Sequence, residues 1–225
     1  IRKIFLGSAP VLSGFLKKFI TVLPLHTQVT CIYGMTEILP IATLDFRKKA
    51  VWEGQGDLLG SIIDKITHRI EKDGELILRG PNLFRGYLGQ KEVQEIATGD
   101  LARVEKEQLV LIGRKKDMII RGNYNIYPGL YESTIQKIAG VAACAMVGLR
   151  NEAKEDEDII LVIEPENPQD ATLAKRVESS IKSGKYSIDT HAIPDKIVVI
   201  RIPRIGRQLK IDKRELLEIL KKEYL

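Results

Sequence analysis

The stretch from Thr98 to Asp117 constrains the fold of this chain more than any other segment. Its centre, Leu101–Ile112, has two short apolar runs around the polar residues Glu105–Gln108, which is typical of two strands joined by a turn. A hairpin returns Asp100 and Arg114 to the same end of a sheet. A carboxylate beside a fork-shaped guanidinium can bind the vicinal hydroxyls of a ribose. An ordinary ion pair across the base of the hairpin is the alternative.

Composition bounds the class of protein only loosely. The chain has 225 residues, enough for one large or two small domains, and a net charge of +5. No apolar run approaches the roughly 20 residues of a membrane span. Basic residues concentrate between Arg201 and Arg214, which fits a nucleic acid or a small anionic ligand equally well. Cys31 and Cys144 form no framework or metal pair and are expected to be buried free thiols in a reducing cytoplasm.

The apolar pattern predicts different structures along the chain. In the first third we expect a helix over Phe15–Val22 and a buried strand over Val29–Ile32. Residues 54–112 contain short strands punctuated by Gly and Asp, with a hairpin turn at Lys72–Gly74. This region therefore favours a small antiparallel sheet or barrel.

The last third favours a compact α+β unit beyond a polar boundary at 114–117. We expect a hairpin around Gly122, followed by a helix that opens at Pro128 and continues to Ala139. Apolar periodicity then predicts strands over 142–147, 159–163 and 196–200, and helices over about 171–183 and 213–222.

Two short motifs near the start carry residue types suited to a nucleotide. Tyr33-Gly34-Met35-Thr36-Glu37 follows the buried strand, where α/β sheets place ligand-binding turns. The tyrosine ring can stack on a purine, Gly34 permits close backbone approach, Thr36 can donate to phosphate and Glu37 can bind Mg²⁺. Alternatively, the tyrosine is a core aromatic residue and the glutamate an exposed acid. The turn Gly7-Ser8-Ala9-Pro10 could pack against a flat ring, or form any tight turn.

Six motifs, in order over essentially the whole chain, resemble those of the adenylate-forming enzymes: acyl-CoA synthetases, luciferases and the adenylation domains of peptide synthetases. The motifs are Gly7–Pro10 (adenine loop), Tyr33–Glu37 (YGxTE), Gly74–Gly80 with Gly86–Leu88 (GELxxxGxxxxxGY), Thr98–Asp100 (TGD), Gly113–Pro128 (GRxKDxIxxGGxNIxP) and Pro203–Asp212 (terminal lysine). Tyr33–Glu37 and Lys115–Ile120 look most like the fatty-acid-activating branch.

The resemblance implies a partial fold of α/β and α+β type. Residues 1–113 would be the end of the large N-terminal domain, a sheet and helix piece with a barrel-like antiparallel part. Residues 114–117 would form the hinge at Lys116, and 118–225 a mobile α+β domain. The residues expected to hold the nucleotide are Gly7, Ser8, Ala9, Pro10, Tyr33, Gly34, Thr36, Asp100 and Arg114.

The family also implies two half-reactions that alternate by rotation of the C-terminal domain. In the first, Lys210 would stabilise the reacting carboxylate and α-phosphate, because its ammonium offsets the charge between two anions. Glu37 would bind Mg²⁺. In the second, the hairpin around Gly122 would present a channel to the incoming thiol.

The sequence departs from the family pattern at several positions. Asn123 stands in place of the second hairpin glycine and adds bulk where a pantetheine arm would pass, and Leu130 replaces a glutamate. Leu209 replaces the glycine before the terminal lysine, so Lys213 remains an alternative to Lys210.

The family's Ser/Thr/Gly-rich phosphate loop is absent from this sequence, and the chain begins at Ile1 in a strand-like run with the apolar residues Ile4–Leu6. We therefore expect the C-terminal half of a longer enzyme, inactive in acyl-AMP formation as an isolated fragment.

Three hypotheses follow for the function. The first is an acyl-CoA synthetase that uses ATP, Mg²⁺ and CoA, with a fatty acid as the expected carboxylic acid. The second is an acyl-AMP ligase that passes the acyl group to a phosphopantetheine carrier protein or another acceptor. The third is a non-catalytic remnant. We expect a cytoplasmic protein with no nucleic-acid partner and no transmembrane segment.

Overall fold

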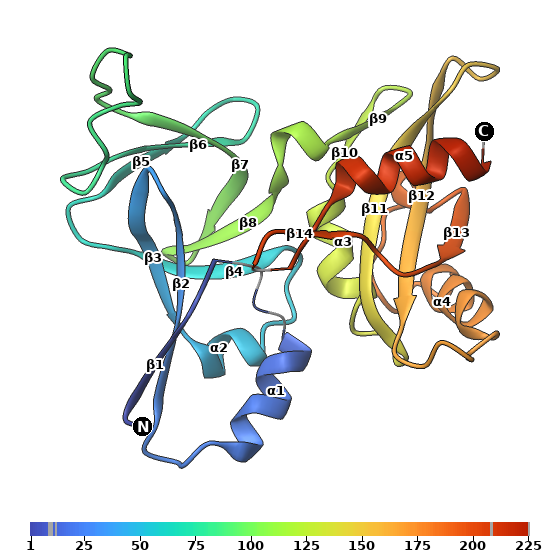
Figure 1. Cartoon of the computed structure of the whole chain (residues 1–225), viewed down its shortest axis with the longest axis horizontal. Coiled ribbons are helices and arrows are strands. Elements are labelled where there is room, and N and C mark those ends of the chain that lie inside the picture. Colours follow the sequence, from blue (N-terminus) through green and yellow to red (C-terminus); the bar gives the residue numbers. More distant parts are fainter. Residues whose placement is uncertain (9–10, 12, 208, 225) are drawn as a thin grey trace. The chain divides into compact units, whose positions relative to one another are not determined.

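The structure, a computed structural model, describes residues 1–8, 11, 13–207 and 209–224. Its contacts divide the chain into two units, Ile1–Lys115 and Lys116–Leu225 (Figure 1). In the part of the chain that is described, no helix is long and apolar enough to span a membrane.

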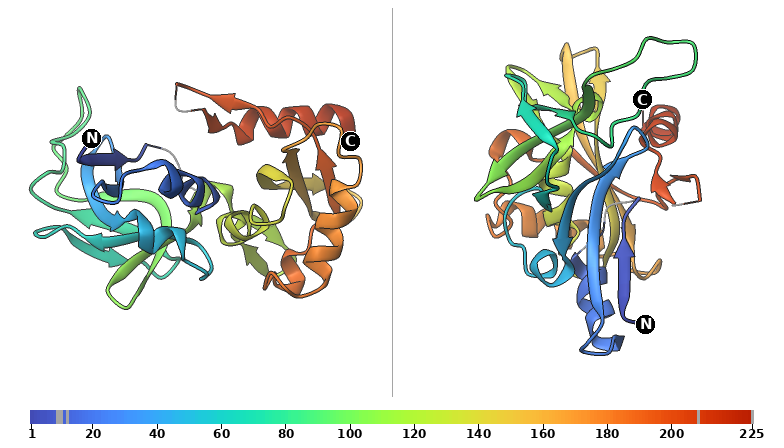
Figure 2. Two further views of the ribbon diagram at one scale, coloured as in Figure 1. Left: turned by 90° about the horizontal axis from the view of Figure 1, so that it is seen from below. Right: turned by 90° about the vertical axis from the view of Figure 1, so that its left-hand side faces the viewer.

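The first unit is built on an eight-stranded sheet with the order β1-β2-β3-β4-β8-β7-β6-β5. The first two strands, side by side at one edge in Figures 1 and 2, run parallel, and all other neighbours run antiparallel. The order has two ends, so the described strands form an open sheet. The strands are β1 (Lys3–Leu6), β2 (Gln28–Met35), β3 (Ile38–Asp45), β4 (Asp57–Ile62), β5 (Thr67–Ile70), β6 (Glu75–Arg79), β7 (Ile96–Glu105) and β8 (Gln108–Arg114).

Two helices, α1 (Ser13–Val22) and α2 (Phe46–Ala50), pack against the first strands of this sheet. Their buried side chains Leu16 and Phe46 join strand residues in one core cluster. A second cluster lies around Ile38 and Leu76. The expected helix, the strand over Val29–Ile32 and the turn at Lys72–Gly74 are present.

The sequence pattern does not predict β3 or α2. The dipeptide Leu39-Pro40 favours a loop on local pattern alone, because proline removes a ladder donor. In the structure, the β2–β3 register shifts between Tyr33 and Met35, next to this proline. Proline is tolerated at such irregularities in a sheet.

The second unit is an α+β unit around a three-stranded sheet of β11 (Val141–Asn151), β12 (Asp156–Pro165) and β13 (Lys196–Val199). The helices α3 (Pro128–Ile135) and α4 (Leu173–Lys182) pack with Met146 and Leu161 on one face of the sheet. The helix α5 (Lys213–Tyr224) packs with Ala145 and Val162 on the other face (Figure 2). Alternate residues of β11 and β12 therefore serve two cores.

Short elements complete this unit. The hairpins are β9 (Ile119–Arg121) with β10 (Tyr124–Ile126), and β14 (Arg204–Ile205) with β15 (Lys210–Ile211). Two 3-10 turns are η1 (Lys115–Asp117), which straddles the division between the units, and η2 (Thr190–Ala192).

Two predicted boundaries in this unit were wrong. The helix that opens at Pro128 ends at Ile135 rather than Ala139, and Gly140 has a left-handed φ of 91° shortly before β11 begins. The strands predicted over 142–147 and 159–163 are longer in the structure, because β11 and β12 extend through most of the acidic segment 151–158 and pair Asn151 with Asp156. Charged side chains indicate that the end of a hairpin is exposed to solvent. They do not indicate where its backbone pairing stops.

Candidate functional site

Asp100 lies at the centre of a polar cluster in the first unit, which it forms with Tyr33 and Arg114. It sits directly opposite Arg114 in the β7–β8 pairing, as the hairpin pattern predicts. The Arg114 Nε lies 2.6 Å from Asp100 Oδ1, and the Tyr33 hydroxyl donates to Asp100 Oδ2 at 2.5 Å. Two side chains, from β2 and β8, therefore converge on one carboxylate of β7.

Burial makes this carboxylate unusual. Asp100 is 2% exposed, whereas half of the Arg114 side chain (51%) faces solvent. Burial, and next the charge of Asp100, raise the pKa of Tyr33, so its hydroxyl stays protonated and donates. The cluster thus combines a shielded acceptor with a guanidinium open to a ligand. The ion pair across the base of the hairpin, the alternative from sequence, is present, and its carboxylate is buried rather than exposed.

The turn that carries Asp100 is held by its neighbours. Thr98 Oγ1 donates to Leu76 O at 2.8 Å and accepts from Asp100 N at 3.0 Å. Gly99 has a left-handed φ of 70° and donates its N–H to Glu75 Oε1 at 3.1 Å. In the sequence, Glu75 is only one residue of a motif, and no local pattern predicts its hydrogen bond to this turn.

The first glycine turn lies beside Tyr33. A Cβ on Gly7 would lie 3.0 Å from Ile32 O, next to the tyrosine in β2. Ser8 is exposed and has a left-handed φ of 69°. Ala9 and Pro10 lie outside the described residues. At Gly34 the side-chain space is filled from within the hairpin, because a Cβ would clash with Leu39 Cδ1.

Thr36 and Glu37 form the two-residue turn between β2 and β3. Thr36 is exposed, and Glu37 accepts the Tyr87 hydroxyl at Oε1, 2.6 Å away. Among the described residues, no group of three or more His, Cys, Asp and Glu side chains is arranged to hold a metal. Mg²⁺ needs only one or two protein carboxylates when substrate phosphates complete its shell. The second carboxylate oxygen of Glu37 fits that requirement.

The residues on either side of Lys116 are tied to different units. Lys115 Nζ lies 2.6 Å from Asp73 and 2.8 Å from Glu75, both in the first unit. Asp117 lies 3.9 Å from Lys213 in the second unit. The exposed Lys116 side chain has no ion pair or hydrogen bond within the described part of the chain.

The structure separates the two candidate lysines. Lys213 Nζ is bound by Glu132 at 2.7 Å and Met146 O at 3.3 Å, and only a fifth of its side chain (20%) is exposed. Lys210, in β15, is exposed, and its side chain has no hydrogen bond or ion pair with the residues that the structure describes. Lys210 is therefore the lysine available to a ligand.

Leu209 precedes Lys210 with a left-handed φ of 51°. A leucine in that region costs about 1–3 kcal/mol, whereas glycine adopts it freely. The conformation is the one that suits the glycine of the family motif. At the other departure, the left-handed position falls on Gly122 (φ 56°), so Asn123 brings no backbone strain.

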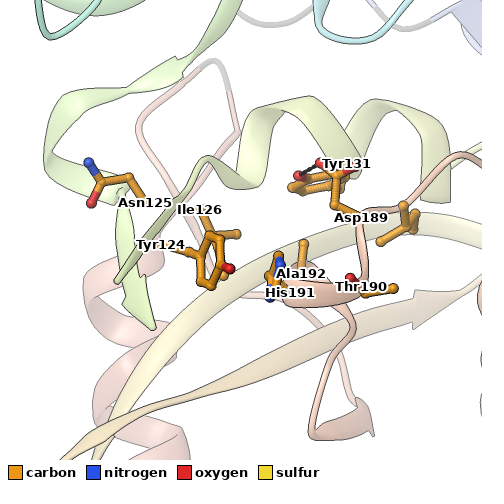
Figure 3. Close-up of a pocket in the computed structure, with 9 residues that line it drawn as sticks. Tyr124, Asn125, Ile126, Tyr131, Asp189, Thr190, His191 and Ala192 are labelled. Atoms are coloured by element: carbon orange, nitrogen blue, oxygen red, sulfur yellow. Dashed lines mark hydrogen bonds between the residues drawn. The ribbon is translucent and has the colours of Figure 1, made fainter. Parts of the chain in front are cut away.

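A pocket of about 440 Å³ lies between β10, α3 and η2 in the second unit (Figure 3). On one wall, the rings of Tyr124 and His191 stack with centroids 3.5 Å apart. On the other, the Tyr131 hydroxyl donates to Asp189 at 2.6 Å. None of the site residues predicted from sequence lines this pocket.

Comparison with known sequences finds relatives of one kind. No family model matches the chain. Over 170 residues (68% of the chain), it is 32% identical to 2-succinylbenzoate–CoA ligase of Enterococcus faecalis. Over 211 residues (85%), it is 28% identical to the mitochondrial medium-chain acyl-CoA ligase of Rattus norvegicus. These matches cover 34% and 33% of the relatives, so the chain spans about a third of their length.

Solved structures resemble the chain over nearly all of its length. o-Succinylbenzoate-CoA synthetase of Bacillus subtilis, solved with its acyl-adenylate intermediate, matches 96% of the chain with a TM-score of 0.73 and 26% identity. The amide bond synthetase McbA of Marinactinospora thermotolerans matches 97% with a TM-score of 0.82, at an identity of 18% that shows the fold alone. The chain covers 46% of each of these two proteins. The predicted fold class is thereby confirmed.

Proposed function

Because the chain belongs to the adenylate-forming enzymes and corresponds to the C-terminal part of their acyl-CoA ligases, we propose that it is the nucleotide-binding and thiol-transfer part of a carboxylate-activating ligase. The observation that carries this proposal is the buried Asp100, contacted by both Tyr33 and Arg114. A carboxylate and a guanidinium at one position match the acceptor and donor needs of a ribose diol. Tyr33 and the turn at Gly7 flank this position and suit an adenine ring.

In the first half-reaction, a carboxylate oxygen of the acid attacks the α-phosphorus of ATP, and pyrophosphate leaves. Asp100 and Arg114 hold the ribose, and Thr36 donates to phosphate. Glu37 would hold Mg²⁺, which when bound would supply positive charge to the phosphates. Lys210 places an ammonium between two anions that otherwise repel each other, which lowers the barrier for their approach.

In the second half-reaction, a thiol attacks the carbonyl carbon of acyl-AMP and gives up its proton to solvent, a thioester forms, and AMP leaves with the electron pair of the broken C–O bond. We propose that Lys116 is the hinge between the two reactions. The tethering of Lys115 to the first unit and of Asp117 to the second supports this position. The hairpin at Gly122 then lines the path of the thiol.

The proposed thiol is that of CoA, and the proposed acid is a fatty acid. We expect full-length protein to convert ATP, CoA and a fatty acid to AMP, pyrophosphate and an acyl-CoA, identified by mass spectrometry. The control offers phosphopantetheinylated carrier protein instead of CoA. Acylation of the carrier alone would favour the second hypothesis, an acyl-AMP ligase. No acyl-AMP with any acid would leave the non-catalytic hypothesis.

We expect the isolated 225-residue chain to show no carboxylate-dependent ATP–pyrophosphate exchange. The phosphates of ATP need many donors for tight binding, and the phosphate loop of the family is absent from this sequence. The full-length protein, assayed in parallel at the same concentration, is the positive control. Exchange by the short chain itself would show that the residues described here suffice for activation.

A further inference from the structure

The β9–β10 hairpin is held from outside by two carboxylates that its own pairing does not require. Ile120 lies in β9, and Gly122 lies in the turn that follows it. Glu157 Oε2 accepts the Ile120 N–H at 2.7 Å. Asp156 accepts the Gly122 N–H with Oδ1 at 2.9 Å and Oδ2 at 3.1 Å. Both acids begin β12, in the acidic segment to which the proposed function gives no role.

The side chain between these two amides is fixed as well. Arg121 donates to Ile193 O at 3.0 Å and to Asp195 Oδ1 at 2.7 Å. Asp195 Oδ2 in turn accepts the Ile159 N–H at 2.8 Å. The hairpin is therefore attached to the three-stranded sheet both by its backbone and by its central side chain.

Gly148 in β11 leaves space for the hairpin and for the Glu157 side chain. A Cβ on Gly148 in β11 would lie 2.8 Å from Ile119 Cγ2 and 3.0 Å from Glu157 Oε2. A larger residue there would displace the carboxylate or the strand. At the tip, in contrast, a Cβ on Gly122 would meet no atom within 4 Å, and its φ is 56°. The tip is shaped by the bonds to its backbone and is open on the side of the missing side chain.

The negative charge of Asp156 strengthens its hydrogen bonds to the Gly122 N–H. The backbone N–H groups of Gly122 and Glu157 lower the pKa of Asp156, so its carboxylate is ionised at neutral pH. Hydrogen bonds to an ionised acceptor are about twice as strong as neutral ones.

We propose that Asp156 and Glu157 are positioning residues for thiol transfer, which fix the backbone of the β9–β10 hairpin so that its Gly122 tip stays open to a pantetheine thiol arm. This proposal rests on the proposed function. Neither acid touches the reacting atoms, and both act through the hairpin. Adenylation does not use the hairpin, so their loss separates the two half-reactions.

The first test measures amide hydrogen exchange in the 225-residue chain with Asp156→Ala and Glu157→Ala. We expect exchange at Gly122 and Ile120, respectively, to rise about tenfold or more, because a charged hydrogen bond is lost. Glu155→Ala is the matched control, since Glu155 is exposed one residue away and its side chain has no hydrogen bond or ion pair in the part of the chain that is described. Its exchange rates should equal those of the unmodified chain.

The second test measures each half-reaction in full-length protein. With Asp156→Ala, we expect thioester formation from supplied acyl-AMP and CoA to fall about tenfold, with ATP–pyrophosphate exchange within about twofold of the unmodified enzyme. Asp156→Asn keeps an acceptor oxygen and should recover part of the loss. A purely structural role would lower both half-reactions together.

Unchanged exchange at both amides, or unchanged thioester formation despite faster exchange, would overturn the positioning role. The unmodified enzyme distinguishes failure of the positioning role from failure of the proposed function. If it forms no acyl-AMP, the proposed function fails, whereas the exchange experiment still decides whether the acids hold the hairpin.

Discussion

Lys210→Ala in the full-length enzyme is expected to slow acyl-AMP formation by about 10²–10³-fold, the cost of removing one preorganised charge from a transition state. Thioester formation from supplied acyl-AMP should change little, because that step does not join two anions. The structure supports this assignment, since the Lys210 side chain is exposed and Leu209 before it adopts the left-handed conformation that the motif needs. The measurement is ATP–pyrophosphate exchange beside single-turnover thioester formation.

Lys213→Ala is the matched control, because it removes the same side chain three residues away. Lys213 binds Glu132 and Met146 O, so its loss leaves the Glu132 carboxylate with one charged partner fewer. We expect this variant to lose about 1–3 kcal/mol of unfolding free energy and to retain exchange activity while folded. The opposite pattern, with exchange lost in Lys213→Ala and retained in Lys210→Ala, would reassign the catalytic lysine.

Asp100→Ala is expected to raise the KM for ATP by about 10–100-fold, since both ribose hydroxyls lose a charged acceptor. The buried position of Asp100 strengthens its bonds, because water does not compete for the carboxylate. Tyr33 and Arg114 lose a common partner at the same time, so the effect exceeds that of Arg114→Ala. Steady-state kinetics with varied ATP and saturating acid would measure both variants.

Asp64→Asn is the control for Asp100. Asp64 is exposed and bonds only to the next backbone N–H in the described structure, so its neutralisation should leave the KM for ATP unchanged. Asp100→Ala with an unaltered KM and a normal melting temperature would contradict the ribose role and leave Asp100 a structural ion pair.

The sequence predicts those parts of the fold that short-range rules determine. The β7–β8 hairpin, and with it the contact between Asp100 and Arg114, follows from apolar spacing around a polar turn. The β9–β10 hairpin and the start of α3 at Pro128 follow from turn and capping chemistry in the same way.

Contacts that depend on tertiary packing could not be predicted. Tyr33 reaches Asp100 from 67 residues away, and nothing in the local sequence indicates its hydroxyl as a donor. The bonds of Glu75 to Gly99 and Lys115 likewise depend on the order of strands in the sheet. For the lysines, sequence left two candidates open, and the partners of Lys213 favour Lys210.

We propose that this chain is part of an enzyme that activates a carboxylic acid as its adenylate. Carboxylate-dependent exchange of labelled pyrophosphate into ATP by the full-length protein tests it most directly, because exchange needs only the first half-reaction. We predict exchange that requires a fatty acid and Mg²⁺ and disappears in Lys210→Ala. A folded full-length protein that binds ATP and shows no exchange with any carboxylic acid would contradict the proposed carboxylate activation.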